Sequence, residues 1–538
     1  MWGRRTMSAA YRVLVADAIA PEGLAPLRQD DRFELVERPG LAGAELARAI
    51  AGMDAVLVRS ATRITRESLA LADRLIVIGR AGVGVDTIDV DAATERGVAV
   101  LTAPAGNTVS AAELTLALML SLVRHVPAAD RSMRAGHWDR NRFNGSELHG
   151  KTLALLGAGR IGGEVARRAR AFGMHVTAYD PFLDDARARE MGIELGALDA
   201  VLCAADVVSV HVPLNEATAG LVGESQLALL KPTAFLVNAA RGGVVDERAL
   251  YEALAARRIA GAALDVYERE PLPADDPLRS LENVVLTPHL GASTTEAQRG
   301  VALEIADAVR AALLEGDLTR AVNAPAVGRE EMRRLRPMIE LAGRLGRLGA
   351  ALLDGALQRA EVRYAGGAEG ALRPLAAGAM IGAMSAAVGR ASVNLVNALH
   401  VAQSRGVHVD QVLAAPHGDF AEYVELRLTG AGGEARVGGA LLAEGHPRLV
   451  VIGDYRVDVV PLGTLVVIRN QDAPGVIGRV GTILGEAGVN IGEYHQARLS
   501  AGGSALAAVS VDGPLPSPVL TALREIPLVL DVRQVQLD

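Results

Sequence analysis

The stretch Lys151-Thr-Leu-Ala-Leu-Leu-Gly157-Ala-Gly159-Arg160-Ile161-Gly162 decides the fold of the first half of the chain. An apolar run that predicts a strand leads into the spacing G-x-G-x-x-G, and a helix is predicted from Gly163 to Phe172. A second predicted strand, 174–179, ends at Asp180, 23 positions after Gly157. This order of strand, glycines, helix, strand and acid is typical of a dinucleotide-binding βαβ unit.

Each residue type in this motif has a physical reason. Gly157 permits a tight turn, Gly159 lets the backbone approach a pyrophosphate, and Gly162 lets the helix lie close to the strand. The helix N-terminus attracts phosphate, and Arg160 is a candidate contact to it. Asp180 can accept hydrogen bonds from both ribose hydroxyls and would repel a 2′-phosphate, which favours NAD over NADP. The alternative is a glycine-rich turn that binds no ligand.

The composition limits the classes of protein. A chain of 538 residues predicts three or four domains. The net charge of −8 without a basic run argues against nucleic acid as a partner, and no uncharged apolar stretch of membrane-spanning length occurs. The single cysteine, Cys203, excludes disulfides and a cysteine-based metal site, so we expect a cytoplasmic protein. Residues 1–10 lack the apolar core of a signal peptide and predict a short disordered tail.

Strands and helices alternate through the first 325 residues in two α/β units. We expect a substrate-binding domain made of residues 11–106 and 290–325, with a dinucleotide-binding domain, 107–289, inserted in it. The helix predicted over 294–315 would cross back to complete the first unit. Residues 326–462 predict a helix at 330–355, a small-residue-rich helical stretch at 374–404 and a strand at 448–460. From 463 to 538 the order β-α-β-β-α-β predicts a ferredoxin-like domain.

Three segments after the glycine motif carry the residue types that oxidation of a 2-hydroxy acid requires. His289 can take the hydroxyl proton, and Arg241 can clamp carboxylate and carbonyl oxygens with its planar fork. Glu270 can fix the tautomer of His289 and favour the imidazolium. Each follows a predicted strand, where α/β sheets place ligand-binding groups. Taken singly, the Arg could cap a turn, the Glu could be a solvated loop residue, and the His could be structural.

On these motifs the chain resembles the D-isomer-specific 2-hydroxyacid dehydrogenases. The resemblance extends from Tyr11 to Asp538, and within the family it is to long members with an intervening domain and a C-terminal ACT domain. It implies an α/β fold of two Rossmann-like or flavodoxin-like lobes with the NAD-binding domain inserted. An α+β intervening domain at 326–462 and a ferredoxin-like ACT domain at 463–538 would follow. It also implies a homotetramer that oxidises 3-phospho-D-glycerate to 3-phosphooxypyruvate with NAD, the first step of L-serine biosynthesis.

The resemblance also implies roles for single residues. Arg241, Glu270 and His289 match the catalytic Arg, Glu and His of the family. The positions that contact NAD are matched by Gly157, Gly159, Arg160, Ile161, Gly162, Asp180, Ala239, Ala240, Arg241, Asp265, His289, Gly291 and Ala292. The positions around phosphoglycerate are matched by Arg59, Ser60, Arg80 and Asn107, and Arg140 matches a basic residue that a neighbouring subunit lends to the phosphate. A phosphate and a carboxylate on one substrate need several cations, which these arginines supply.

The C-terminal domain carries Asn470, Asp472 and Asn490 where related ACT domains bind an amino acid between two paired domains. The resemblance implies L-serine as the effector, and the alternative is a turn and a helix cap in a domain that serves only assembly. Two other functions remain open. One is a hydroxypyruvate or glyoxylate reductase, or another D-2-hydroxyacid dehydrogenase; the other is an NAD-sensing regulator without catalysis.

Overall fold

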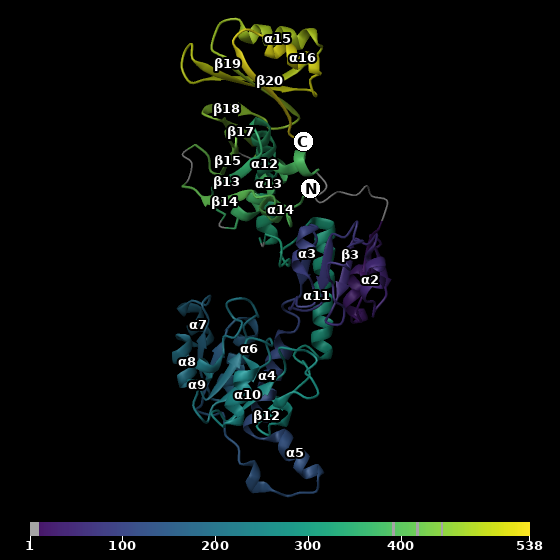
Figure 1. The fold of residues 1–538 in the computed structure, drawn as a ribbon, viewed down its shortest axis with the longest axis vertical. Coiled ribbons are helices and arrows are strands. Elements are labelled where there is room, and N and C mark those ends of the chain that lie inside the picture. The colour runs from purple at the N-terminus through teal and green to yellow at the C-terminus, as the bar shows by residue number, and fades with distance from the viewer. Residues whose placement is uncertain (1–9, 326, 369, 390–392, 416–418, 443–444) are drawn as a thin grey trace.

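The computed structural model describes residues 10–325, 327–368, 370–389, 393–415, 419–442 and 445–538, and its strands form four sheets (Figure 1). The predicted tail at 1–10 lies outside the described residues except for Ala10. Among the described residues no single helix is long and apolar enough to cross a membrane, although the bent pair Thr108–Val123 and Val126–Arg134 meets the length and composition test together.

The first sheet has five parallel strands in the order β2-β1-β3-β4-β5, which is a flavodoxin-like order. The helix α11 returns from the far end of the second unit and packs its buried side, including Ile305 and Val309, against this sheet. At Gly79 in β4, a Cβ would lie 2.7 Å from Val309 Cγ2. The elements of this lobe are β1 (Tyr11–Val15), η1 (Pro21–Leu24), α1 (Ala25–Arg28), β2 (Phe33–Glu37), α2 (Gly43–Ile50), β3 (Ala55–Val58), β4 (Val77–Arg80), α3 (Val90–Glu95), β5 (Ala99–Thr102) and α11 (Thr295–Glu315).

The second sheet has seven parallel strands in the order β12-β11-β10-β9-β6-β7-β8. The order reverses between β6 and β9, which is the point where such sheets bind ligands. The strands are β6 (Thr152–Leu156), β7 (His175–Tyr179), β8 (Glu194–Leu195), β9 (Val207–Val210), β10 (Phe235–Asn238), β11 (Gly261–Leu264) and β12 (Val284–Leu286). The helices are α4 (Thr108–Val123), α5 (Val126–Arg134), η2 (Arg140–Phe143), α6 (Arg160–Ala171), α7 (Asp185–Met191), α8 (Leu198–Ala204), α9 (Glu224–Ala228), α10 (Glu247–Ala255) and η3 (Pro277–Ser280).

The third sheet lies in residues 327–462 and mixes one parallel pair with antiparallel pairs. One expectation for this region is wrong: 448–460 is a hairpin rather than one strand, and it turns at Gly453, where φ is +57°. The predicted helical stretch at 374–404 contains two helices. The elements are α12 (Arg329–Leu352), β13 (Leu357–Ala365), α13 (Leu372–Val388), α14 (Ala398–Ser404), β14 (His408–Leu413), β15 (Tyr423–Gly430), β16 (Gly433–Leu441), β17 (Pro447–Ile452) and β18 (Tyr455–Val459).

The fourth sheet is antiparallel in the order β20-β21-β19-β22, as the predicted ferredoxin-like arrangement requires. Its apolar residues toward α15 and α16 form one core, and those on its other face, including Leu465 and Val467, join the core of the third sheet. Figure 1 shows this domain stacked on the intervening region. The elements are β19 (Thr464–Gln471), α15 (Val476–Glu486), β20 (Ile491–Arg498), β21 (Ser504–Val511), α16 (Ser517–Arg524) and β22 (Val529–Gln536).

Candidate active site

The three glycines of the motif occupy positions that only glycine fits or that leave room for a ligand. Gly157 has φ +92°, and a Cβ there would lie 2.9 Å from Val212 Cγ1. A Cβ at Gly162 would lie 2.3 Å from the carbonyl oxygen of Gly157, so α6 could not approach the turn. At Gly159, the N-cap of α6, a Cβ would meet no atom within 4 Å, which leaves open space in front of the helix N-terminus. The turn therefore fits a pyrophosphate.

Asp180 follows β7 and lies beside this turn. One carboxylate oxygen accepts a hydrogen bond from the backbone of Ala158 and the other accepts one from the backbone of Phe182, both at 2.9 Å. The acid is thereby fixed next to the glycine-rich loop, where an NAD ribose is expected. Arg160, the exposed first residue of α6, and the half-buried Ile161 border the same turn.

Two buried polar residues at the ends of β10 and β11 hold the loops that carry Arg241 and His289. Asn238, 2% exposed, accepts a hydrogen bond from the Ala240 amide at 3.1 Å and donates to the Arg241 carbonyl at 3.0 Å, and so folds the 239–241 loop. Asp265 is fully buried and accepts hydrogen bonds from the backbone of Leu290 and Gly291 at 2.7 and 2.9 Å. The structure thus places Asp265 beneath the loop of His289. Ala292, another predicted NAD contact in this loop, is half-buried.

Asn238 was not among the predicted site residues. The signal that could have found it is a polar side chain at the last position of an otherwise apolar strand, which must find a partner when buried.

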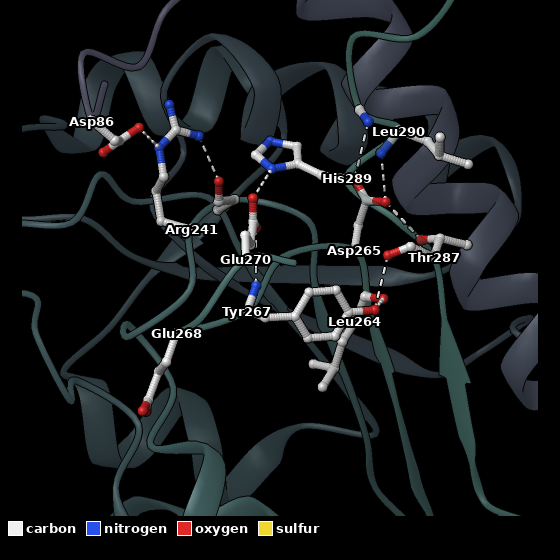
Figure 2. A network of polar contacts seen from close by, with 12 residues as sticks. Asp86, Arg241, Leu264, Asp265, Tyr267, Glu268, Glu270, Thr287, His289 and Leu290 are labelled. Carbon is white, nitrogen blue, oxygen red and sulfur yellow. Dashed lines mark hydrogen bonds and ion pairs between the residues drawn. The ribbon is translucent and has the colours of Figure 1, made fainter. Parts of the chain in front are cut away.

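His289 and Glu270 form a hydrogen-bonded pair, with 2.8 Å between His289 Nδ1 and Glu270 Oε2 (Figure 2). The hydrogen bond from Glu270 raises the pKa of His289 above its usual value despite partial burial. Burial would raise the pKa of Glu270, but the hydrogen bond to His289 and the neighbouring charges lower it below its usual value. The pair therefore favours an ionised Glu270 and a basic imidazole, which suits proton abstraction.

Arg241 follows β10 in the second lobe and contacts the first lobe. Its Nε lies 3.4 Å from Asp86 Oδ2 in the first lobe, and its Nη1 donates to the Ala240 carbonyl at 2.6 Å (Figure 2). Gly84 permits this approach, because a Cβ there would lie 2.3 Å from Arg241 Nη2. The guanidinium of Arg241 thus faces both lobes.

The first lobe contributes further cations at its strand ends. Burial, and then repulsion from Arg241, lower the pKa of Arg80 to about 10, with Arg59 adding to the repulsion. Arg80 Nε and Asn107 Oδ1 are buried and have no hydrogen-bond partner among the described residues. Ser60 is exposed beside Arg59. Mutually repelling arginines with an unpaired donor fit an anionic substrate.

Within one chain, Arg140 does not lie near the other predicted substrate-binding residues, and Asp472 does not lie near Asn490. Arg140 follows α5 by six positions, and α5 lies at the far end of the second unit from the first lobe (Figure 1). Asp472 lies beside Arg498 at one end of β20, whereas Asn490 precedes its other end and donates to Asp512. Eight strand residues span roughly 20 Å or more. One serine cannot contact Asp472 and Asn490 of the same chain.

The prediction for Asn470 needs a correction. Its side chain is 2% exposed within β19, where it donates to the Gln471 carbonyl and accepts from Gln496 Nε2 at 3.3 Å. A buried amide with these partners does not present itself to a ligand at the surface, so Asn470 supports the loop that carries Asp472.

Two family descriptions match the chain: D-isomer specific 2-hydroxyacid dehydrogenase, NAD binding domain, over residues 116–291, and D-3-phosphoglycerate dehydrogenase intervening domain, over 334–453. The D-3-phosphoglycerate dehydrogenase of Synechocystis sp. is 40% identical over 528 residues, which cover 98% of this chain and 95% of that protein. The enzyme of the same name from Bacillus subtilis is 39% identical over 531 residues, covering 98% and 100%.

Among solved structures, a glyoxylate reductase from Paecilomyes thermophila has a TM-score of 0.54 at 32% identity, over 59% of this chain and 99% of its own. The likeness to the two full-length relatives extends over nearly the whole of both sequences, through the intervening and C-terminal domains. The chain therefore belongs to the D-3-phosphoglycerate dehydrogenases of the D-isomer-specific 2-hydroxyacid dehydrogenase family, and its second domain is an NAD-binding domain.

Proposed function

We propose that the chain oxidises 3-phospho-D-glycerate to 3-phosphooxypyruvate with NAD, the first step of L-serine biosynthesis. The observation that carries this proposal is the His289–Glu270 pair beside Arg241, next to a glycine-rich turn that leaves room for a dinucleotide. The full-length relatives bear the name of this activity.

The residues divide the work of the reaction. Bound NAD supplies the hydride acceptor. With its Nδ1–H donating to Glu270, His289 leaves Nε2 to take the hydroxyl proton as the substrate loses a hydride from the same carbon. Glu270 holds the positive charge that then forms on the imidazole. Arg241 clamps the carboxylate and the developing carbonyl oxygen with two parallel N–H groups, in place of its present contact with Asp86.

The phosphate would be bound by the first lobe. Arg80 ends β4 and Arg59 follows the adjacent strand β3. The buried Asn107 Oδ1, which has no hydrogen-bond partner among the described residues, lies at the N-cap of α4 on the path between the lobes. A phosphate between these arginines would relieve the repulsion that lowers the pKa of Arg80. Lobe closure would then exclude water from the reacting groups.

The His289→Ala variant tests the catalytic role. We expect NADH formation from 3-phospho-D-glycerate to fall by about 10²–10⁴-fold, because a positioned general base contributes that much. NAD binding, measured by fluorescence titration, should weaken far less than turnover falls, because His289 is one of several residues expected to contact NAD. Unchanged turnover in the variant would contradict the proposed mechanism.

A glyoxylate or hydroxypyruvate reductase is the second candidate, since a solved glyoxylate reductase shares the fold of the first two domains. The arginines of the first lobe and the two additional domains argue for the phosphorylated substrate. A regulator that senses NAD without catalysis is a third reading, and the intact Arg241, Glu270 and His289 argue against it.

We further propose a homo-oligomer, a tetramer by the resemblance, in which a neighbouring chain lends Arg140 to the phosphate. The segment that carries Arg140 supports this, because α5 buries none of its residues and Val126, Met133 and Trp138 are 53%, 53% and 75% exposed. Exposed apolar side chains on one projecting segment indicate a protein contact.

We also propose a cytoplasmic location, which the lone Cys203 supports.

L-serine is the proposed effector of the C-terminal domain. Because Asp472 and Asn490 lie at opposite ends of β20, we place each serine between two copies, with Asp472 from one and Asn490 from the other. The Asp472 carboxylate would hold the α-amino group and the Asn490 amide would bind the serine carboxylate or hydroxyl.

A further inference from the structure

One tyrosine contacts the loops of all three proposed catalytic residues. Tyr267 lies three positions after the end of β11, between the loop of Arg241 and the end of β12 (Figure 2). We propose that Tyr267 is a positioning residue, which holds Glu270 against His289 and fixes the Arg241 loop beside them. This inference rests on the proposed oxidation of a 2-hydroxy acid by these three residues.

The first two contacts of Tyr267 set both members of the acid–base pair. Its backbone N–H donates to Glu270 Oε1 at 3.2 Å, while the other oxygen of Glu270 faces His289. Its hydroxyl lies 2.8 Å from the Thr287 carbonyl and 3.1 Å from the Leu264 carbonyl. Thr287 precedes His289 by two positions, so one residue holds the carboxylate from one side and the start of the histidine loop from the other.

The third contact involves Arg241 through the next residue. A Cβ at Gly242 would lie 1.9 Å from the carbonyl oxygen of Tyr267 and 2.6 Å from the backbone nitrogen of Glu268. Only a residue without a side chain can lie this close, so the arginine loop rests directly on the Tyr267–Glu268 peptide. A shift of Tyr267 would therefore move Arg241 relative to Glu270.

Burial makes this tyrosine a fixed donor. Tyr267 is 7% exposed and belongs to the core that covers one face of the second sheet. Burial raises its pKa to about 12, so the hydroxyl keeps its proton throughout the range in which the enzyme would be assayed. A hydroxyl that always donates and a ring that cannot turn hold a constant geometry.

The test is the Tyr267→Phe variant, which removes the hydroxyl and keeps the ring. We expect kcat with 3-phospho-D-glycerate to fall about tenfold, because small misplacements of reacting groups cost up to about 10²-fold. KM for the substrate and the Kd of NAD should change less than about twofold. The acid limb of the pH profile of kcat/KM should move to lower pH, since a misaligned Glu270 no longer raises the pKa of His289 as far.

A matched control and a second background separate positioning from general stability. Tyr423→Phe removes an equally buried hydroxyl that donates to Glu425 in the intervening domain, so it should lower Tm without moving the acid limb. In a Glu270→Gln background, Tyr267→Phe should add no further shift of the limb, because the two act through one contact.

Three results decide the matter. An acid limb that stays in place in Tyr267→Phe, with or without a lower Tm, would overturn the positioning role, and so would an equal shift in both backgrounds. If the wild type itself forms no NADH from any 2-hydroxy acid, the proposed function fails, and the inference about Tyr267 falls with it.

Discussion

At the scale of single residues, the rate depends on the protonation of one imidazole. Oxidation by the proposed mechanism needs a neutral His289, and the hydrogen bond from Glu270 raises the pKa of His289 above its usual value. The value of kcat/KM should therefore rise with pH, with a midpoint above that of an unpaired histidine. Glu270→Gln removes the hydrogen-bonded charge, so the midpoint should move to lower pH while kcat falls by at least about tenfold.

The measurement is the pH dependence of kcat/KM for the wild type and Glu270→Gln, in buffers of constant ionic strength. Glu247→Gln offers a control, since that carboxylate lies near the same loop but accepts from the Glu268 backbone instead of His289. A midpoint that stays in place when Glu270 is replaced would contradict the proposed pairing.

We propose that Asp180 selects NAD over NADP. Its carboxylate would repel a 2′-phosphate, so Asp180→Asn should lower the ratio of kcat/KM with NAD to that with NADP by about tenfold or more. The amide oxygen can still accept from one of the two backbone donors that hold Asp180.

Asp184→Asn is the control for this charge change. Asp184 is an exposed N-cap of α7, four positions after Asp180, and Asn caps a helix about as well as Asp. In Asp184→Asn, the ratio of kcat/KM with NAD to kcat/KM with NADP should equal that of the wild type. An unchanged ratio in Asp180→Asn, measured by initial rates with both cofactors, would show that the acid does not select the cofactor.

At the scale of elements, short buried strands are the features that sequence predicts best. The strand predicted over 174–179 forms β7, His175–Tyr179, because an apolar or β-branched run between turn residues leaves few alternatives. The predicted fold class is confirmed by the four sheets and by the family match. The arrangement of the catalytic loops also follows, since all three lie after strands of one parallel sheet.

The elements whose predicted bounds differ from the structure each have a physical reason. The helix α6 begins at Arg160, three positions before the prediction, because glycines of low helix propensity form its first turn over the ligand space. The hairpin of β17 and β18 lies in valine-rich sequence, where periodicity does not mark the ends of a strand. The contacts of Tyr267 can be recognised only once its backbone partners are known, whereas Asn238 leaves a signal as the polar last residue of an apolar strand.

The contact between α6 and its turn gives a prediction at this scale. A methyl group at residue 162 would collide with the Gly157 carbonyl, whereas one at residue 163 would meet only the flexible end of Met191. Both Gly162→Ala and Gly163→Ala raise helix propensity by about 1 kcal/mol. We expect Gly162→Ala to weaken NAD binding by at least about tenfold and Gly163→Ala to leave it unchanged or raise Tm. Equal Kd values in the two variants would contradict the role assigned to the turn.

At the scale of the whole molecule, the third domain lies next to the first lobe, and the C-terminal domain is stacked on the third (Figure 1). The segments that join the lobes meet where Glu304 of α11 accepts hydrogen bonds from the backbone of Ala105 and Gly106, each at 3.0 Å. This contact fixes the crossing point about which the lobes would close on the substrate.

The separation of Asp472 and Asn490 predicts how serine would bind. Isothermal titration should show saturable serine binding to the wild type, and Asp472→Ala and Asn490→Ala should each abolish it. Oligomers reassembled from equal amounts of the two variants should regain part of the binding, because a site shared by two chains is intact when each supplies its unmutated residue.

The three possible outcomes test the shared site, the role of Asp472 and the role of serine as an effector. No restoration in the mixed oligomers, with both single variants inactive in binding, would contradict a shared site. Binding that survives in Asp472→Ala would remove that residue from the site, and no binding to the wild type would refute the effector role.

The most direct test of the proposed function is a comparison of kcat/KM for 3-phospho-D-glycerate and for D-glycerate, with NAD as the cofactor. An unphosphorylated substrate lacks the phosphate that the arginines of the first lobe would bind. Each lost hydrogen bond to a charged group removes about 1.5–3 kcal/mol. We therefore predict a preference of at least about 10²-fold for the phosphorylated acid. Equal values of kcat/KM for the two acids would contradict the account.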